Sequence, residues 1–209
     1  MAANLITIFR IALLAVIFVF LSRETVNGHS AAFFLTIILI ALDGVDGMVA
    51  RRLHQESQFG SVLDIVVDRI VENCFWIFFA VRGVIPYWFP MIVAGRGFLV
   101  DGIRSVALAR GMTAFGTNTL HKSKLGAFLV SSRFSRGLYG VAKVCSFLFL
   151  ILIEAMELEG VRSVLSTGSR QLIIGIGYTT IYFSLFLCLL RGIPVLAESR
   201  PFLFPGRTP

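Results

Sequence analysis

Apolar residues gather in six long segments of the chain, separated by short polar or turn-forming stretches. Each segment holds about 20 residues, the length of helix that crosses the hydrocarbon core of a bilayer. The breaks include Asn27-Gly28 and the stretch from Gly83 to Pro86, which are typical of turns. The predicted spans cover residues 5–22, 29–50, 60–82, 86–110, 134–157 and 170–195. The pattern therefore predicts an all-α, polytopic membrane protein with six transmembrane helices, built as a single domain over residues 1–209.

Composition favours the same environment. Hydrophobic residues make up 56% of the 209 residues, charged residues make up 15%, and the mean hydropathy is +0.85. Soluble domains carry about 25% charged residues. The net charge of +7 suits loops that face anionic lipid headgroups. Because no basic stripe with interleaved aromatic residues lies outside the apolar segments, we expect membrane lipid, and not nucleic acid, as a partner.

The Lys and Arg residues of the loops and segment ends are distributed unequally between the two sides of the predicted spans. With the N-terminus in the cytoplasm, twelve of them fall on the inside, whereas four fall on the outside, namely Arg23, Arg82, Arg162 and Arg170. Cytoplasmic loops of membrane proteins carry such an excess. The distribution therefore predicts that both termini are cytoplasmic.

Acidic residues are concentrated at the junction of the second and third predicted spans. The chain has twelve acidic residues, and four of them are Asp43, Asp46, Asp64 and Asp68. The first two are three residues apart and the last two are four apart, so each pair lies on one face of a helix. A short connection makes the two helices neighbours. The sequence therefore predicts that two adjacent helices present four carboxylates to each other.

Four carboxylates in an apolar segment require a compensating charge. An ionised Asp at the centre of a membrane helix costs about 2.5–3.5 kcal/mol, so four would cost about 10–14 kcal/mol, which equals the whole stability of many proteins. Divalent cations would offset this cost directly, and an all-oxygen ligand set suits Mg²⁺ or Mn²⁺. Paired carboxylates in a membrane are also typical of a proton or ion path. An ion-coupled carrier therefore stays open as an alternative.

Small residues and one arginine flank the acidic pairs. Gly47 and Ala50 follow Asp46, and Gly60 lies four residues before Asp64. Small residues let helix backbones approach or leave room for a flat ligand. Arg51 ends the second predicted helix, where a guanidinium is able to bind a phosphate with two hydrogen bonds.

The whole spacing reads D-x-x-D-G-x-x-A-R, eight residues, then G-x-x-x-D-x-x-x-D, and it begins at Asp43 and ends at Asp68. It resembles the signature of the CDP-alcohol phosphotransferase (CDP-alcohol phosphatidyltransferase) family at all eight fixed positions. The resemblance implies a six-helix membrane enzyme that transfers a phosphatidyl group from CDP-diacylglycerol to an alcohol acceptor and releases CMP. Members of the family are often dimers, so a homodimer is also implied.

The resemblance also assigns roles to the motif residues. It implies that two divalent cations, Mg²⁺ or Mn²⁺, are bound by Asp43, Asp46, Asp64 and Asp68. It makes Asp68 the general base that accepts the proton of the acceptor hydroxyl. The CDP group would lie against Asp46, Gly47, Ala50, Arg51 and Gly60.

Two further segments bear on the acceptor. Asn4 to Arg10 and Gly95 to Gly111 are similar to segments of the bacterial phosphatidylglycerophosphate synthases in that family, although Gly97 stands where those usually carry Glu. The resemblance implies glycerol 3-phosphate as the acceptor and an active site on the cytoplasmic face of a bacterial inner membrane. The phosphate of the acceptor would need cations, for which the candidates are Arg104, Arg136 and Lys143.

The basic residues Arg104, Arg136 and Lys143 would also suit other acceptors, and they could instead contact membrane lipid. The same cations would suit inositol phosphate as the acceptor, serine would need them less, and basic side chains at span ends also snorkel to the lipid surface. A catalytically inactive relative is a further alternative, although the complete set of Asp residues argues against it.

Overall fold

The computed structural model describes residues 2–52, 58–109 and 132–199, and nearly all of these residues are helical. Six long helices are joined by short turns and by segments outside the described ranges. They are α1 (Ala2–Leu21), α2 (Val26–Arg52), α3 (Gln58–Val81), α4 (Trp88–Ala109), α6 (Arg133–Ala155) and α8 (Thr167–Glu198). A single-turn helix, α7 (Glu159–Arg162), lies between α6 and α8. The all-helical prediction is confirmed for the described residues.

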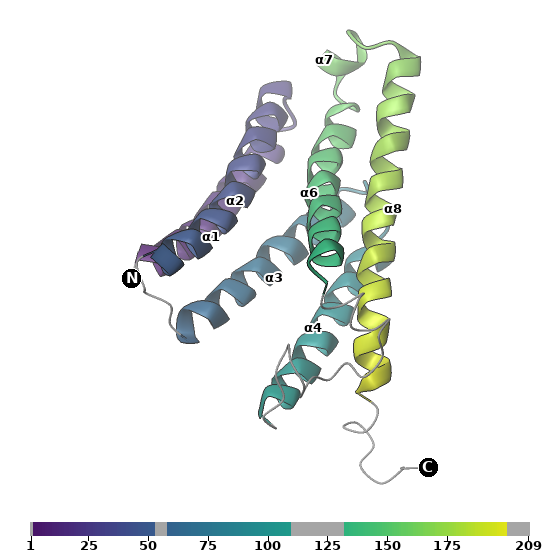
Figure 1. Cartoon of the computed structure of the whole chain (residues 1–209). Helices are drawn as coiled ribbons and strands as arrows, with labels where there is room; N and C mark the ends of the chain where they lie inside the picture. The colour runs from purple at the N-terminus through teal and green to yellow at the C-terminus, as the bar shows by residue number, and fades with distance from the viewer. Residues whose placement is uncertain (1, 53–57, 110–131, 200–209) are drawn as a thin grey trace.

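The long helices form one bundle in which successive helices run in opposite directions (Figure 1). Helix α1 packs against α2 and α3, while α8 packs against α6 and α4. Helices α2 and α6 also touch, and α3 contacts α4, so α3 crosses the middle of the bundle. The start of α1, the end of α2, the start of α3 and the end of α8 all lie at the same end of the bundle (Figure 1). We call this the junction end.

The structure has a helix at each of the six predicted places. Among the described helices, only three are both long enough and apolar enough to cross a membrane. These spans are Val26–Gly44, Phe134–Ala155 and Thr167–Ala197, and Leu5–Leu21 is a shorter apolar helix. Helices α3 and α4 fall short because ionisable residues interrupt them, with Asp64, Asp68, Arg69 and Glu72 in α3 and Arg96, Asp101 and Arg104 in α4. Charge within these helices is therefore the feature that distinguishes them.

A glycine with a positive φ angle, Gly83, follows the end of α3. Gly83 has a φ of +74°, a conformation that L residues with a side chain adopt at a cost. The Gly83 amide donates to Ala80 O at 3.1 Å, and the Val84 amide donates to Phe79 O at 2.9 Å. This pair of hydrogen bonds is the Schellman arrangement that satisfies the last carbonyls of a helix. The turn then directs the chain into α4.

The core of the bundle is an aromatic cluster centred on α3. Phe75 stacks on Phe147 of α6 with ring centroids 4.6 Å apart, and it meets Phe18 of α1 edge-on at 5.5 Å. Trp76 packs against the same Phe147 and against Phe89 of α4. Aromatic contacts of this kind add about 0.5–1.5 kcal/mol to the burial of the rings. The cluster therefore fixes α3 against three other helices.

Ion pairs tie three helices together at the end opposite the junction. Arg82 contacts Glu154 at 2.5 Å and Glu24 at 2.6 Å. The hydrogen bond to Glu154, followed by that to Glu24, raises the pKa of Arg82 above its ordinary value. The ring of buried His29 lies 3.3 Å from the second oxygen of Glu154. Because Glu154 is buried, its charge depends on these partners.

The aromatic cluster yields a test of the fold. We expect Phe75→Ala to lower the free energy of unfolding by about 3–5 kcal/mol, because it leaves a cavity among rings that are fully buried. Phe134 is 71% exposed on α6, so the matched Phe134→Ala should change it by less than about 0.5 kcal/mol. Equilibrium unfolding in mixed detergent micelles measures both variants. Equal losses in the two variants would contradict the assignment of the core.

Candidate active site

Three of the predicted acidic residues meet at the junction end of the bundle. Asp43 lies near the end of α2, and Asp64 and Asp68 lie on successive turns of α3. One carboxylate oxygen from each residue lies within 4.8 Å of the others. The spacing of three and four residues in the sequence thus translates into a common face, as the helical periodicity predicts. We call these three residues the acidic cluster.

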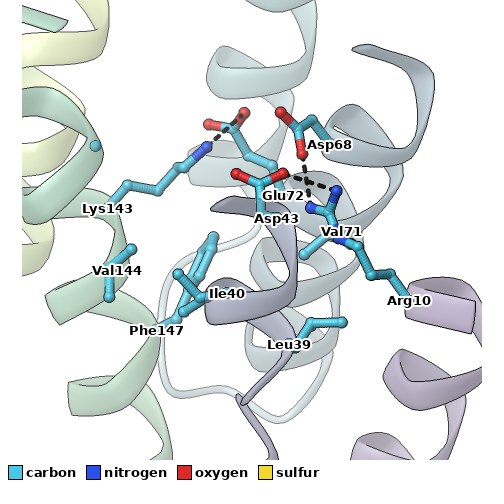
Figure 2. Close-up of a pocket in the computed structure, with 11 residues that line it drawn as sticks. Arg10, Leu39, Ile40, Asp43, Asp68, Val71, Glu72, Lys143, Val144 and Phe147 are labelled. Carbon is cyan, nitrogen blue, oxygen red and sulfur yellow. Dashed lines mark hydrogen bonds and ion pairs between the residues drawn. The ribbon is translucent and has the colours of Figure 1, made fainter. Parts of the chain in front are cut away.

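The guanidinium of Arg10 in α1 is bound to all three members of the acidic cluster. It lies 2.7 Å from Asp43, 3.4 Å from Asp64 and 2.7 Å from Asp68. The Arg10 side chain is only 3% exposed, whereas the three Asp side chains are 42–46% exposed. The cation therefore reaches the carboxylates from the protein interior, and the exposed part of each Asp side chain stays accessible to a ligand. Figure 2 shows Arg10 bound to Asp43 and Asp68.

Sequence reasoning did not assign a role to Arg10. It counted this residue among the basic residues at the cytoplasmic side of the first span. The available signal was a single arginine inside an otherwise apolar helix, since an intramembrane cation is commonly paired with a nearby carboxylate.

The remaining motif residues are placed only by their backbone. Asp46, Gly47, Ala50 and Arg51 belong to the last two turns of α2, but their side chains lie outside the described part of the structure. Gly60 lies in the first turn of α3, one turn before Asp64. The structure thus continues α2 through the first half of the motif, and the predicted contacts with CDP remain predictions.

The acidic cluster fits a hard divalent cation. Two oxygen ligands of one Mg²⁺ at 2.0–2.1 Å lie at most about 4.2 Å apart, and the cluster oxygens already lie within 4.8 Å. Carboxylate oxygens are the ligands that Mg²⁺ and Mn²⁺ prefer. The exposed part of each Asp side chain gives a cation access to the cluster. The donor set therefore supports the predicted cation site.

A cavity of about 170 Å³ extends from the acidic cluster toward α6. Asp43 and Asp68 line one side of it, and Lys143 of α6 lines the other. Leu39, Val71 and Phe147 close its apolar floor (Figure 2). The structure therefore brings the predicted Lys143 to the same space as the predicted carboxylates.

The third acidic residue of α3, Glu72, also lines this cavity. Its carboxylate accepts a hydrogen bond from the Tyr139 hydroxyl at 2.8 Å and one from Arg69 at 3.0 Å. The Lys143 ammonium lies 3.6 Å from it. Glu72 lies one turn beyond Asp68, but sequence reasoning did not select it because it falls outside the motif.

Basic residues of α4, α6 and α8 form a group that is linked to the cavity through Tyr139. Arg104 lies near enough to Arg96 and Arg136 for their charges to repel, and Arg191 is repelled by the same three residues. The Arg191 guanidinium also lies over the Tyr139 ring at 5.7 Å and donates to Ser135 Oγ at 2.8 Å. We call Arg96, Arg104, Arg136 and Arg191 the arginine group.

The arginine group contains two of the predicted acceptor residues, Arg104 and Arg136, and adds Arg191 of the last helix. Repulsion between like charges in a partly apolar setting makes such a group a favourable place for an anion. Lys143 connects to this group through the ring of Tyr139, which lies 5.9 Å from its ammonium. Arg191 was missed because nothing in the sequence shows that the last helix packs against α4 and α6.

Comparison with known proteins agrees with this geometry. The chain belongs to the CDP-alcohol phosphatidyltransferase family, because the model of that family matches residues 1–179. The family resemblance stated from the motif is therefore confirmed, and the chain is a member of a family of transferases.

Individual relatives carry different names. A Mycobacterium bovis protein provisionally named cardiolipin synthase is 31% identical over 61% of this chain and 60% of its own length. A CDP-diacylglycerol–glycerol-3-phosphate 3-phosphatidyltransferase from Bacillus subtilis is 31% identical over 49% of this chain and 53% of its own. A CDP-diacylglycerol–inositol 3-phosphatidyltransferase from Schizosaccharomyces pombe is 52% identical over 16% of this chain and 14% of its own. The chain thus spans about half to 60% of the first two relatives.

The acidic cluster yields a test that needs no substrate. We expect Asp43→Asn and Asp64→Asn each to weaken Mn²⁺ binding by at least about tenfold, since a lost charged ligand costs more than about 1.4 kcal/mol. Electron paramagnetic resonance of free Mn²⁺ in a titration of the detergent-solubilised protein gives the affinity. Glu157→Gln, an exposed acidic position at the other end of the bundle, is the matched control. Unchanged affinity in both Asp variants would remove the cluster as a cation site.

Proposed function

We propose that this protein transfers a phosphatidyl group from CDP-diacylglycerol to an alcohol acceptor and releases CMP. The observation that carries the proposal is the gathering of Asp43, Asp64 and Asp68 on the open side of a buried guanidinium, with Lys143 on the opposite wall of one cavity. Family membership supports the same reaction. A carrier would have no use for a motif with fixed small residues beside its carboxylates.

We assign the role of general base to Asp68. It accepts the proton of the acceptor hydroxyl, whose oxygen attacks the β-phosphorus of CDP-diacylglycerol. The new phosphorus–oxygen bond forms as the bond to the CMP oxygen breaks, and CMP carries away the negative charge. Two divalent cations held by Asp43, Asp46, Asp64 and Asp68 would stabilise the charge on the diphosphate oxygens. Gly47, Ala50, Arg51 and Gly60 are the proposed contacts of the CDP group.

Glycerol 3-phosphate is the acceptor that we propose. Lys143 lines the cavity, and the arginine group is linked to Lys143 through the ring of Tyr139. Charged donors are the strongest partners of a phosphate. The name of the Bacillus subtilis relative supports this acceptor. The names of the other relatives make phosphatidylglycerol and inositol compounds the acceptors to compare with it.

We further propose that the chain folds as one domain, that it lies in a bacterial inner membrane, and that the junction end faces the cytoplasm. The start of α1 and the end of α8 lie at that end (Figure 1), where the excess of Lys and Arg predicts a cytoplasmic side. A soluble phosphorylated acceptor would then reach the arginine group from the cytoplasm. A homodimer remains a prediction of the family resemblance.

CMP release measures the reaction directly. Purified protein with CDP-diacylglycerol and Mg²⁺ should release CMP with glycerol 3-phosphate, and much less with inositol phosphate, inositol, serine or phosphatidylglycerol. Asp68→Asn should lower kcat by about 10²–10⁴, which is the usual contribution of a general base, while Glu157→Gln keeps the wild-type rate. CMP formation with a different acceptor would overturn the specificity. No CMP with any acceptor from folded protein would overturn the function.

The acceptor cations yield a separate test. Lys143→Met should raise KM for glycerol 3-phosphate by about 10–150-fold, because a hydrogen bond to a charged group contributes about 1.5–3 kcal/mol. KM for CDP-diacylglycerol should stay within about twofold of wild type. Steady-state kinetics with each substrate varied in turn separates the two constants. An equal rise in both would show that Lys143 does not select the acceptor.

A further inference from the structure

Glu72 is a buried carboxylate that is shared by three donors from two helices. Its side chain is 3% exposed. Arg69 on the preceding turn of α3 and Tyr139 of α6 hydrogen-bond to it at 3.0 and 2.8 Å. Breaking such a buried pair costs about 3–5 kcal/mol in other proteins. Removal of one of these partners would therefore leave a buried charge without full compensation.

Arg69 alone does not balance Glu72. Two of its nitrogens bind Asp101 of α4, with Nε at 2.7 Å and Nη2 at 3.2 Å, and only Nη1 points to Glu72. The cation that complements the charge of Glu72 is Lys143, whose ammonium lies 3.6 Å from Oε2. This distance exceeds that of a hydrogen bond. Glu72 thus attracts the ammonium electrostatically without a direct hydrogen bond.

Asp68 is a second carboxylate in the same cavity that could attract the Lys143 ammonium. Asp68 lies four residues before Glu72, on the same face of α3, and both line the cavity together with Lys143. In Figure 2 the lysine points to Glu72, while Asp68 is bound to Arg10 on the other side. Without the charge on Glu72, Asp43 and Asp68 would be the remaining carboxylates that line the cavity together with the ammonium.

We propose that Glu72 is a positioning residue for the acceptor. It holds the Lys143 ammonium on the wall of the cavity and keeps it away from Asp68, so that the ammonium is presented to the phosphate of the acceptor. Tyr139 extends this arrangement, because its hydroxyl binds Glu72 while its ring lies beside both Lys143 and Arg191. The inference rests on the proposed function, since it concerns the acceptor of that reaction.

A double-mutant cycle tests whether Glu72 acts through Lys143. Glu72→Gln should raise KM for glycerol 3-phosphate by about tenfold or more and leave KM for CDP-diacylglycerol within about twofold, since the removal of one charged contact is worth more than about 1.4 kcal/mol. In the Lys143→Met background the same substitution should add less than about twofold, because coupled residues are not additive. Glu72→Asp, which keeps the charge, should recover part of the loss.

Glu154→Gln is the matched control. Glu154 is also a buried carboxylate bound to an arginine, but it lies at the other end of the bundle. This variant should lose stability without a selective change in KM. A binding readout accompanies the kinetics: glycerol 3-phosphate should raise the Tm of the wild type in the absence of CDP-diacylglycerol, and raise that of Glu72→Gln by less at the same concentration.

The outcomes separate the inference from the function on which it rests. Folded wild-type protein that releases no CMP with any acceptor would overturn the proposed function, and CMP release only with another acceptor would overturn the specificity on which the inference rests. Active wild-type protein in which the Glu72 and Lys143 effects multiply would overturn the inference alone. The same holds if Glu72→Gln raises both KM values equally or behaves like Glu154→Gln, since a merely structural role predicts those results.

Discussion

The cost of placing ionised side chains among apolar helices governs the arrangement of this protein. An unpaired charge in such a setting is unfavourable by several kcal/mol, and α3 alone carries Asp64, Asp68, Arg69 and Glu72. Each of these side chains contacts an opposite charge on another helix or on a neighbouring turn. The helices α1, α4 and α6 therefore supply the partners, and the packing order of the bundle follows from where those partners lie.

Helix α3 consequently has two halves with different tasks. The half near the junction end presents carboxylates to the cavity, whereas the other half contributes Phe75 and Trp76 to the aromatic cluster. Phe147 of α6 belongs to both regions, because it stacks in the cluster and closes the floor of the cavity. Rigid packing beneath the site fixes the backbone that carries Asp68 and Glu72.

The sequence predicted what depends on local periodicity. The acidic residues meet because Asp64 and Asp68 share a face of one helix and Asp43 lies on the helix before it. The partners of these acids could not be predicted in this way, since Arg10 reaches Asp68 across 58 residues and Tyr139 reaches Glu72 across 67. Hydropathy predicted the places of the six long helices. Charged residues within α3 and α4 keep these two helices from qualifying as membrane spans by composition. The carboxylates of α3 are the ones that form the candidate site.

The interior arginine has a consequence for how the protein is made. A guanidinium keeps its proton at every physiological pH, so Arg10 supplies a permanent counter-charge to the acidic residues from within the chain itself. Insertion into the bilayer and docking of the first three helices therefore need no metal at the moment of synthesis. A divalent cation at the proposed site would bind after these helices have packed, and its removal would leave their packing in place.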